Sequence, residues 1–118
     1  MGVRTKVLIV DDNSDVRRLY AIGLNQRGFE VKLAANGAEA VERFAREKPD
    51  VILLDWVMPL MDGGEVLNKL SGEGTVSVIV ISGQQPPERV DPRIRRCLIK
   101  PVSIDELVTE IERPAAVS

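Results

Sequence analysis

A chain of 118 residues is long enough for one domain with a buried core, and its 44% hydrophobic and 29% charged residues are typical of a folded protein. The formal net charge of -2 gives no electrostatic reason to expect binding to nucleic acid or to a membrane surface. A single cysteine excludes an internal disulfide and fits a reducing cytoplasm. The absence of histidine excludes histidine acid–base chemistry, histidine metal ligands and histidine autokinase activity.

Apolar runs of strand length alternate with segments of helical periodicity along the chain. The predicted strands are 5–10, 29–34, 51–54, 76–81 and 96–99. The predicted helices are 14–26, 38–47, 64–70 and 103–113. Strands that are almost continuously apolar, each separated from the next by a helix, predict a parallel sheet covered on both faces, which is the doubly wound α/β class.

The segment 83–95 departs from this alternation. A crossover helix is expected here, but Pro92 would break it, and the Pro86-Pro87 pair would delay its start. We therefore predict a short or irregular fourth crossover helix of one or two turns at most.

Polar side chains stand at the carboxyl ends of the predicted strands: Asp11 and Asp12, Asp55, Ser82, and Lys100. Crossovers in a parallel sheet bring these ends to the same edge, so we expect the side chains to converge on one crevice. Three carboxylates close together require a cation, and Mg²⁺ prefers oxygen ligands. A lysine and a hydroxyl in the same crevice would hold an anion, and the set predicts phosphoryl transfer onto Asp55.

These residues resemble the receiver domains of two-component response regulators, over essentially the whole chain. The resemblance rests on Asp11-Asp12, the run Asp-Trp-Val-Met-Pro-Leu-Met-Asp-Gly at 55–63, Ser82-Gly83 and Lys100-Pro101. It implies a flavodoxin-like, five-stranded sheet in the order 2-1-3-4-5. It also implies one receiver domain over 1–118, with an ordered core at about 5–113 and a tail or linker remnant at 114–118.

The resemblance implies a magnesium site around a phosphoacceptor, Asp55. Asp12, Asp55 and the backbone carbonyl of Val57 would ligate Mg²⁺ directly, and Asp11 would act through bound water. In the family, the positions of Val57 and Gln84 influence the rate of dephosphorylation. The valine side chain cannot orient an attacking water, so we predict a long-lived phosphoryl group.

The resemblance also implies partners and a mode of action. Ser82 and Lys100 would bind the phosphoryl group, beside a cis peptide bond between Lys100 and Pro101. A histidine kinase or a histidine phosphotransfer protein would donate the group, and a changed partner-binding surface would transmit the signal. We expect a cytoplasmic monomer, or a weak dimer, that assists its own phosphorylation and dephosphorylation and is otherwise not an enzyme.

Two features differ from the family pattern. Cys97 stands three positions before the lysine, where the family usually has Tyr or Phe, so a rotating aromatic side chain cannot report phosphorylation here. The segment 83–95 is also shorter than usual and belongs to the region that commonly forms the output and dimer face. Our hypothesis is that this chain signals through a remodelled segment 83–95.

Two other classes of function compete with this prediction. An interaction module of the same fold, working without phosphorylation, is favoured by Cys97 and disfavoured by the complete set of acids and lysine. A phosphatase with an aspartate nucleophile would need a second acid two positions later, where Asp55 is followed by Val57. The phosphatase is therefore ranked last.

Overall fold

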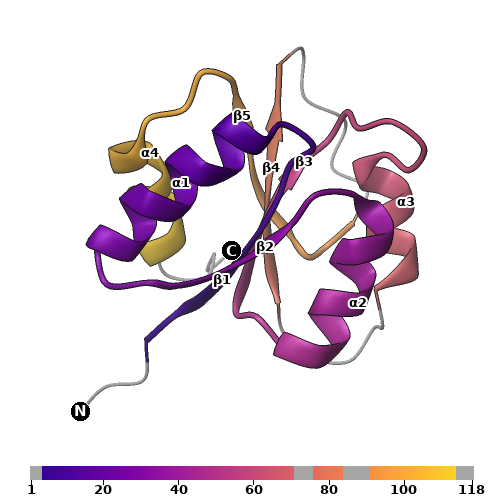
Figure 1. Ribbon diagram of the computed structural model, residues 1–118, viewed down its shortest axis with the longest axis horizontal. Coiled ribbons are helices and arrows are strands. Elements are labelled where there is room, and N and C mark those ends of the chain that lie inside the picture. The colour runs from indigo at the N-terminus through magenta and orange to yellow at the C-terminus, as the bar shows by residue number, and fades with distance from the viewer. Residues whose placement is uncertain (1–3, 71–75, 84–90, 114–118) are drawn as a thin grey trace.

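The computed structural model describes residues 4–70, 76–83 and 91–113, which form a single alternation of strands and helices (Figure 1). The strands are β1 (Lys6–Val10), β2 (Glu30–Ala34), β3 (Val51–Asp55), β4 (Ser77–Ser82) and β5 (Ile94–Ile99). The helices within the described residues are α1 (Ser14–Gln26), α2 (Gly37–Glu47), α3 (Gly63–Lys69) and α4 (Ile104–Glu112). None of the helices in this part of the chain is long and apolar enough to cross a membrane.

The five strands form one parallel sheet in the order β2-β1-β3-β4-β5, which confirms the predicted class and order. Helices α1 and α4 cover one face of the sheet, and α2 and α3 cover the other (Figure 1). Every residue of β3 is buried, as expected for a central strand with helices on both sides.

The core has two layers, because successive side chains of a strand point to opposite faces of the sheet. In β1, Leu8 and Val10 belong to the layer beneath α2 and α3, whereas Val7 and Ile9 belong to the layer beneath α1 and α4. The same alternation holds along β3. Both layers are therefore built almost entirely from aliphatic side chains, as the low aromatic content of 3% requires.

The ends of the helices carry the expected capping residues. Asn13 caps α1, with its side-chain oxygen accepting from the backbone N–H groups of Asp15 at 2.9 Å and Val16 at 3.1 Å. Ser103 and Glu106 form a capping box at the start of α4. Gly28, just after the end of α1, has a φ of 93°, a conformation that favours glycine.

Several predicted boundaries were wrong by one or two residues. The strands β3 and β4 extend by one residue to include Asp55 and Ser82, and β5 begins at Ile94 instead of residue 96. The earlier start of β5 shortens the predicted irregular segment 83–95. Most of that segment, and with it the predicted fourth crossover helix, lies outside the described residues, as does the predicted tail 114–118.

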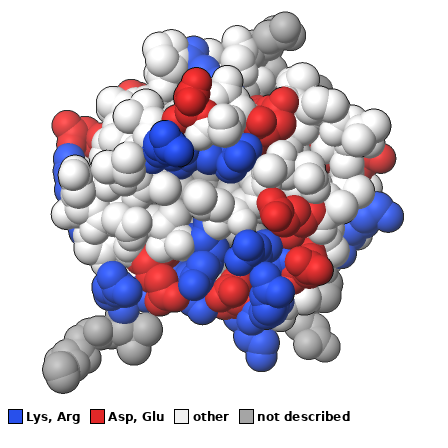
Figure 2. Space-filling view, viewed as in Figure 1, with Lys and Arg blue, Asp and Glu red and all other residues white. Residues whose placement is uncertain are grey.

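Charged side chains of both signs lie interspersed on the face of the molecule shown in Figure 2. Lys6 and Lys32 form a network of ion pairs, in which each approaches both Glu30 and Glu47 within 3.8–4.0 Å. Partly exposed pairs of this kind contribute little to stability individually.

Candidate functional site

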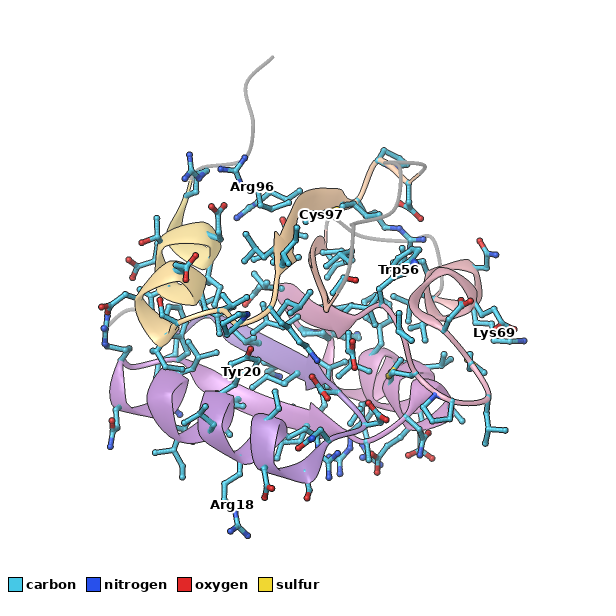
Figure 3. The ribbon with its side chains drawn as sticks, turned by 90° about the horizontal axis from the view of Figure 1, so that it is seen from above. Arg18, Tyr20, Trp56, Lys69, Arg96 and Cys97 are labelled. Atoms are coloured by element: carbon cyan, nitrogen blue, oxygen red, sulfur yellow. The ribbon has the colours of Figure 1, made fainter. Side chains whose placement is uncertain are left out.

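The carboxyl edge of the sheet brings the predicted site residues together. Asp11 directly follows β1, Asp55 and Ser82 end β3 and β4, and Lys100 directly follows β5. Backbone hydrogen bonds continue the pairing at this edge: Asp11 N–H donates to the Ala34 carbonyl at 3.2 Å, and Lys100 N–H donates to the Ser82 carbonyl at 2.7 Å. Figure 3 views the molecule from above, onto this edge. The peptide bond between Lys100 and Pro101 is cis, as the family resemblance implied.

Three carboxylates form an acidic cluster at this edge. One oxygen each from Asp11, Asp12 and Asp55 lie within 4.8 Å of one another. Asp11 and Asp55 are buried, with 2% and 4% of their surfaces exposed, whereas Asp12 is exposed. The cluster therefore combines two desolvated carboxylates with an opening to solvent at the third. This set of hard oxygen donors fits Mg²⁺, which keeps part of its water shell when a protein binds it.

Lys100 provides the positive charge of the site. Its Nζ donates a hydrogen bond to Asp11 Oδ2 at 3.3 Å and lies 3.6 Å from Asp55 Oδ1. Partial burial lowers the pKa of the Lys100 ammonium, but the carboxylates of Asp11 and Asp55 outweigh this and raise the pKa overall. Lys100 therefore stays protonated at neutral pH and sits between the two buried acids.

The pKa of Asp55 is raised from 3.8 to about 6. The largest cause is burial, followed by the negative charge of Asp11, and a side-chain hydrogen bond with Asp12 acts in the same direction. Lys100 and the backbone hydrogen bond with Val57 lower the pKa only in part. A cation bound among these carboxylates would favour the ionised form of Asp55, which is the nucleophilic form.

Two residues that the sequence analysis did not assign to the site hold Asp11 in place. The backbone N–H of Asn13 donates to Asp11 Oδ1 at 2.9 Å, and Arg17 Nη1 donates to the backbone carbonyl of Asp11 at 2.7 Å. Arg17 projects from the first turns of α1, where a sequence pattern identifies an arginine only as a charged surface residue. The aspartate–x–asparagine spacing before a helix is a signal that could have indicated the role of Asn13.

The other candidate residues differ in their exposure. Ser82 is buried, with 1% of its surface exposed, at the end of β4. Val57 is 64% exposed in the loop after β3. Cys97 is only partly buried and packs against the core layer beneath α2 and α3. Gln84 lies outside the described residues.

Comparisons with known proteins give a consistent result. Residues 7–112 match the family described as Response regulator receiver domain. The chain is 37% identical over 115 residues to the transcriptional regulatory protein PrrA of Mycobacterium tuberculosis. This alignment covers 91% of this chain and 48% of PrrA. The chain is also 34% identical over 118 residues to the regulatory protein AtoC of Escherichia coli, in an alignment that covers 96% of this chain and 26% of AtoC.

A solved structure gives a similar fold. The structure superimposes on the chemotaxis protein CheY4 of Vibrio cholerae with a TM-score of 0.79, at 26% sequence identity, covering 94% of this chain and 98% of CheY4. The match therefore spans nearly all of the solved CheY4 chain, but about half of PrrA and about a quarter of AtoC.

Proposed function

Since the chain belongs to the response regulator receiver domain family, we propose that Asp55 accepts a phosphoryl group from a phosphohistidine of a partner protein. The observation that carries this proposal is the approach of Lys100 Nζ to both Asp11 and Asp55, within 3.3 Å and 3.6 Å. A lysine held between two buried carboxylates, next to a third, provides what a phosphoryl transfer site needs: a nucleophile, a set of metal ligands and a cation for the transferred group.

In the proposed reaction, an oxygen of Asp55 attacks the phosphorus atom of the phosphohistidine. A bond between Asp55 and phosphorus forms as the bond between phosphorus and the imidazole nitrogen breaks, and that nitrogen keeps the electron pair. Lys100 pairs with the oxygens of the transferred group, and the hydroxyl of Ser82 donates a hydrogen bond to it. A Mg²⁺ ion held by Asp12, Asp55 and the Val57 carbonyl, with Asp11 acting through water, would neutralise charge on the same oxygens.

The proposed reaction needs a donor protein, and its signal needs a downstream protein. The donor is a histidine kinase or a histidine phosphotransfer protein, and the domain acts in the cytoplasm by changing its contacts with a downstream protein. Residues 1–118 act as one receiver unit, a monomer or weak dimer, that catalyses only its own phosphorylation and dephosphorylation.

Phosphorylation of Asp55 can be tested by measuring the intact mass of the protein after incubation with Mg²⁺ and a small phosphodonor such as acetyl phosphate. We expect one added phosphoryl group, which is absent after chelation of Mg²⁺ and absent in Asp55→Asn. The matched control is Asp62→Asn, because Asp62 is an exposed acid that caps α3 and asparagine also caps helices. An adduct on Asp55→Asn, or none on the wild type, would contradict the proposal.

A second candidate is an interaction module that works without phosphorylation. Cys97 favours it, because the small side chain on β5 cannot act as the aromatic reporter of phosphorylation. Absence of an adduct in the mass experiment would favour this candidate over the first.

The lifetime of the phosphoryl group is expected to depend on the residue at position 57. Val57 lies two residues after Asp55, is 64% exposed, and has no group that orients water. Val57→Asn supplies a carboxamide, and one added hydrogen bond to the attacking water predicts roughly tenfold faster phosphate release. The rate of loss of the added mass after removal of the phosphodonor measures this, with Val57→Leu as the control. Equal rates in the asparagine and leucine variants would contradict the prediction.

A further inference from the structure

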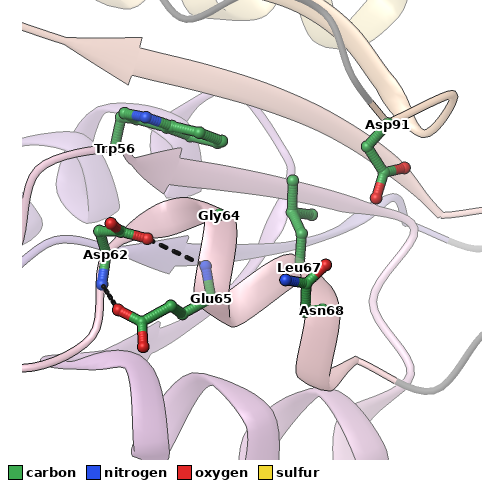
Figure 4. Close-up of a pocket in the computed structure, with 7 residues that line it drawn as sticks. All are labelled: Trp56, Asp62, Gly64, Glu65, Leu67, Asn68 and Asp91. Atoms are coloured by element: carbon green, nitrogen blue, oxygen red, sulfur yellow. Dashed lines mark hydrogen bonds between the residues drawn. The ribbon is translucent and has the colours of Figure 1, made fainter.

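A pocket of about 330 Å³ opens beside the loop that follows β3 (Figure 4). We call it the Trp56 pocket; it is lined by Trp56, Asp62, Gly64, Glu65, Leu67, Asn68 and Asp91. These residues come from the loop after β3, from α3 and from the residues just before β5. The volume is at the lower end for ligand pockets, so it suits one long side chain better than a nucleotide or another large cofactor.

The indole ring of Trp56 forms a fixed wall of this pocket. The backbone of Trp56 is held on both sides, since its N–H donates to the Ile81 carbonyl at 3.0 Å and its carbonyl accepts from Gly63 N–H at 2.9 Å. A Cβ atom at Gly63 would lie 2.5 Å from the ring atom Cε3, so the missing side chain lets the ring lie against the start of α3. The buried side chain of Leu67 adds a second apolar surface.

Two carboxylates of the pocket belong to the start of α3. Asp62 and Glu65 form the capping box of α3, in which Asp62 Oδ1 and Glu65 Oε1 accept backbone N–H groups at 3.0 Å and 3.3 Å (Figure 4). These two hydrogen bonds use one oxygen of each carboxylate. None of the ion pairs among the described residues involves Asp62 or Glu65. The side chain of Lys69 points away from the sheet in Figure 3.

The third acid of the pocket is already neutralised. Arg93 donates to both oxygens of Asp91, from Nε to Oδ1 at 3.0 Å and from Nη2 to Oδ2 at 2.7 Å. The same Nη2 also donates to the carbonyl of Leu67 at 2.8 Å. Within the described part of the chain, Asp62 and Glu65 are therefore the acids of the pocket that have no ion-pair partner.

We propose that the Trp56 pocket receives an arginine side chain from a partner protein. A guanidinium group is planar and weakly hydrated, so it stacks on an indole ring while its N–H groups pair with carboxylates. Its aliphatic stem would lie along Leu67. A lysine ammonium lacks the planar shape and is more strongly hydrated, so the combination of a flat aromatic wall and two carboxylates favours arginine.

This inference does not depend on phosphorylation of Asp55. The pocket and the acidic cluster are nevertheless linked along the chain, because Trp56 directly follows Asp55. Binding to the Trp56 pocket is therefore measured without a phosphodonor or Mg²⁺, so that Asp55 stays unmodified.

The probe for the experiment is arginine amide, titrated into ¹⁵N-labelled protein at low ionic strength. The chain has one tryptophan, so the indole N–H signal in a ¹H–¹⁵N spectrum reports only Trp56. We expect a saturable shift of this signal in the millimolar range. Citrulline amide, which has nearly the same shape without the charge, and lysine amide are each expected to bind at least fivefold more weakly.

Two substitutions remove the charges while keeping the cap of α3. Asparagine caps a helix as aspartate does, and glutamine replaces glutamate in a capping box, so Asp62→Asn with Glu65→Gln is expected to fold normally. We expect the double variant to bind arginine amide at least fivefold more weakly than the wild type. The matched control is Glu42→Gln, an exposed acid on α2, which is expected to bind as the wild type does.

Three results would overturn the proposal. Citrulline amide binding as tightly as arginine amide would show an apolar pocket without charge recognition. Unchanged affinity in the double variant would place the binding elsewhere. A shift of the indole signal with protein concentration alone would show that a second copy of this chain occupies the pocket.

Discussion

Replacement of Asp55 by asparagine is expected to raise the free energy of unfolding of the metal-free protein by about 2 kcal/mol at pH 8. The fold raises the pKa of Asp55 from 3.8 to about 6, mainly through burial and then through the charge of Asp11. At about 1.4 kcal/mol per pKa unit this shift approaches 3 kcal/mol, and screening by solvent at the exposed side of the cluster reduces it to about 2 kcal/mol. Asparagine has the same shape and no charge, so the variant avoids this penalty.

The sign of the effect defines its pH dependence. A raised pKa means that the folded state favours the protonated carboxyl, so this contribution is fully present below pH 3.8 and is lost as pH rises through about 6. The stability difference between the variant and the wild type should therefore grow between about pH 4 and pH 7 and then stay constant. Urea unfolding followed by Trp56 fluorescence, in the presence of a chelator, measures this difference.

Two controls identify the source of the effect. Asp62→Asn removes an exposed acid, and its stability should stay within about 0.5 kcal/mol of the wild type across the same pH range. Added Mg²⁺ should narrow the difference between Asp55→Asn and the wild type, because a metal that binds the folded state stabilises it. A difference that does not change with pH would contradict the assignment of the raised pKa to Asp55.

The sheet could be predicted from the sequence because its cause is local. The four apolar residues that precede Asp55 in β3 form an unbroken run. Such a strand buries both of its faces, which is typical of a parallel sheet with helices on both sides. The ends of the strands could not be predicted in this way. Asp55 and Ser82 belong to their strands because their backbones pair with Ile81 and Ile99, and backbone pairing does not depend on side-chain polarity.

The start of β5 was missed for a related reason. Arg93 and Arg95 flank Ile94 and interrupt the apolar pattern, and charged residues are rarely found inside a strand that is buried on both faces. In the structure β5 is an edge strand, and its two arginines have partners on α4, the element that follows β5. Arg95 donates to the carbonyl of Glu110 at 3.0 Å, and Arg96 pairs with the carboxylate of Glu110 at 3.1 Å.

The composition of the acidic cluster could also be predicted, since topology alone brings the ends of β1, β3 and β5 to one edge. Its electrostatics could not. The difference between the buried Asp11 and the exposed Asp12, and the brace from Arg17 to the Asp11 carbonyl, depend on how α1 packs against the sheet. The pKa of Asp55 follows from these distances and not from residue type.

Lys100→Met is expected to slow phosphorylation of Asp55 by a small phosphodonor about 100-fold at saturating Mg²⁺. Removal of one preorganised charge that stabilises a transition state typically has an effect of this order. In this site the substitution has two consequences: the transferred group loses its cation, and the carboxylates of Asp11 and Asp55 lose the charge that lies 3.3 Å and 3.6 Å away. Methionine keeps most of the apolar stem, so packing changes little. The rate of mass gain measures the effect.

The control for this prediction separates loss of charge from loss of fold. Lys69→Met removes an exposed lysine on α3, and its phosphorylation rate should equal that of the wild type. Circular dichroism of Lys100→Met should show the folded state, because a fall in rate carries meaning only if the sheet is intact. A folded Lys100→Met variant that gains mass as fast as the wild type would mean that the phosphoryl group is neutralised by the metal alone. The position of Lys100 between two buried acids would then serve only to keep the metal-free site stable.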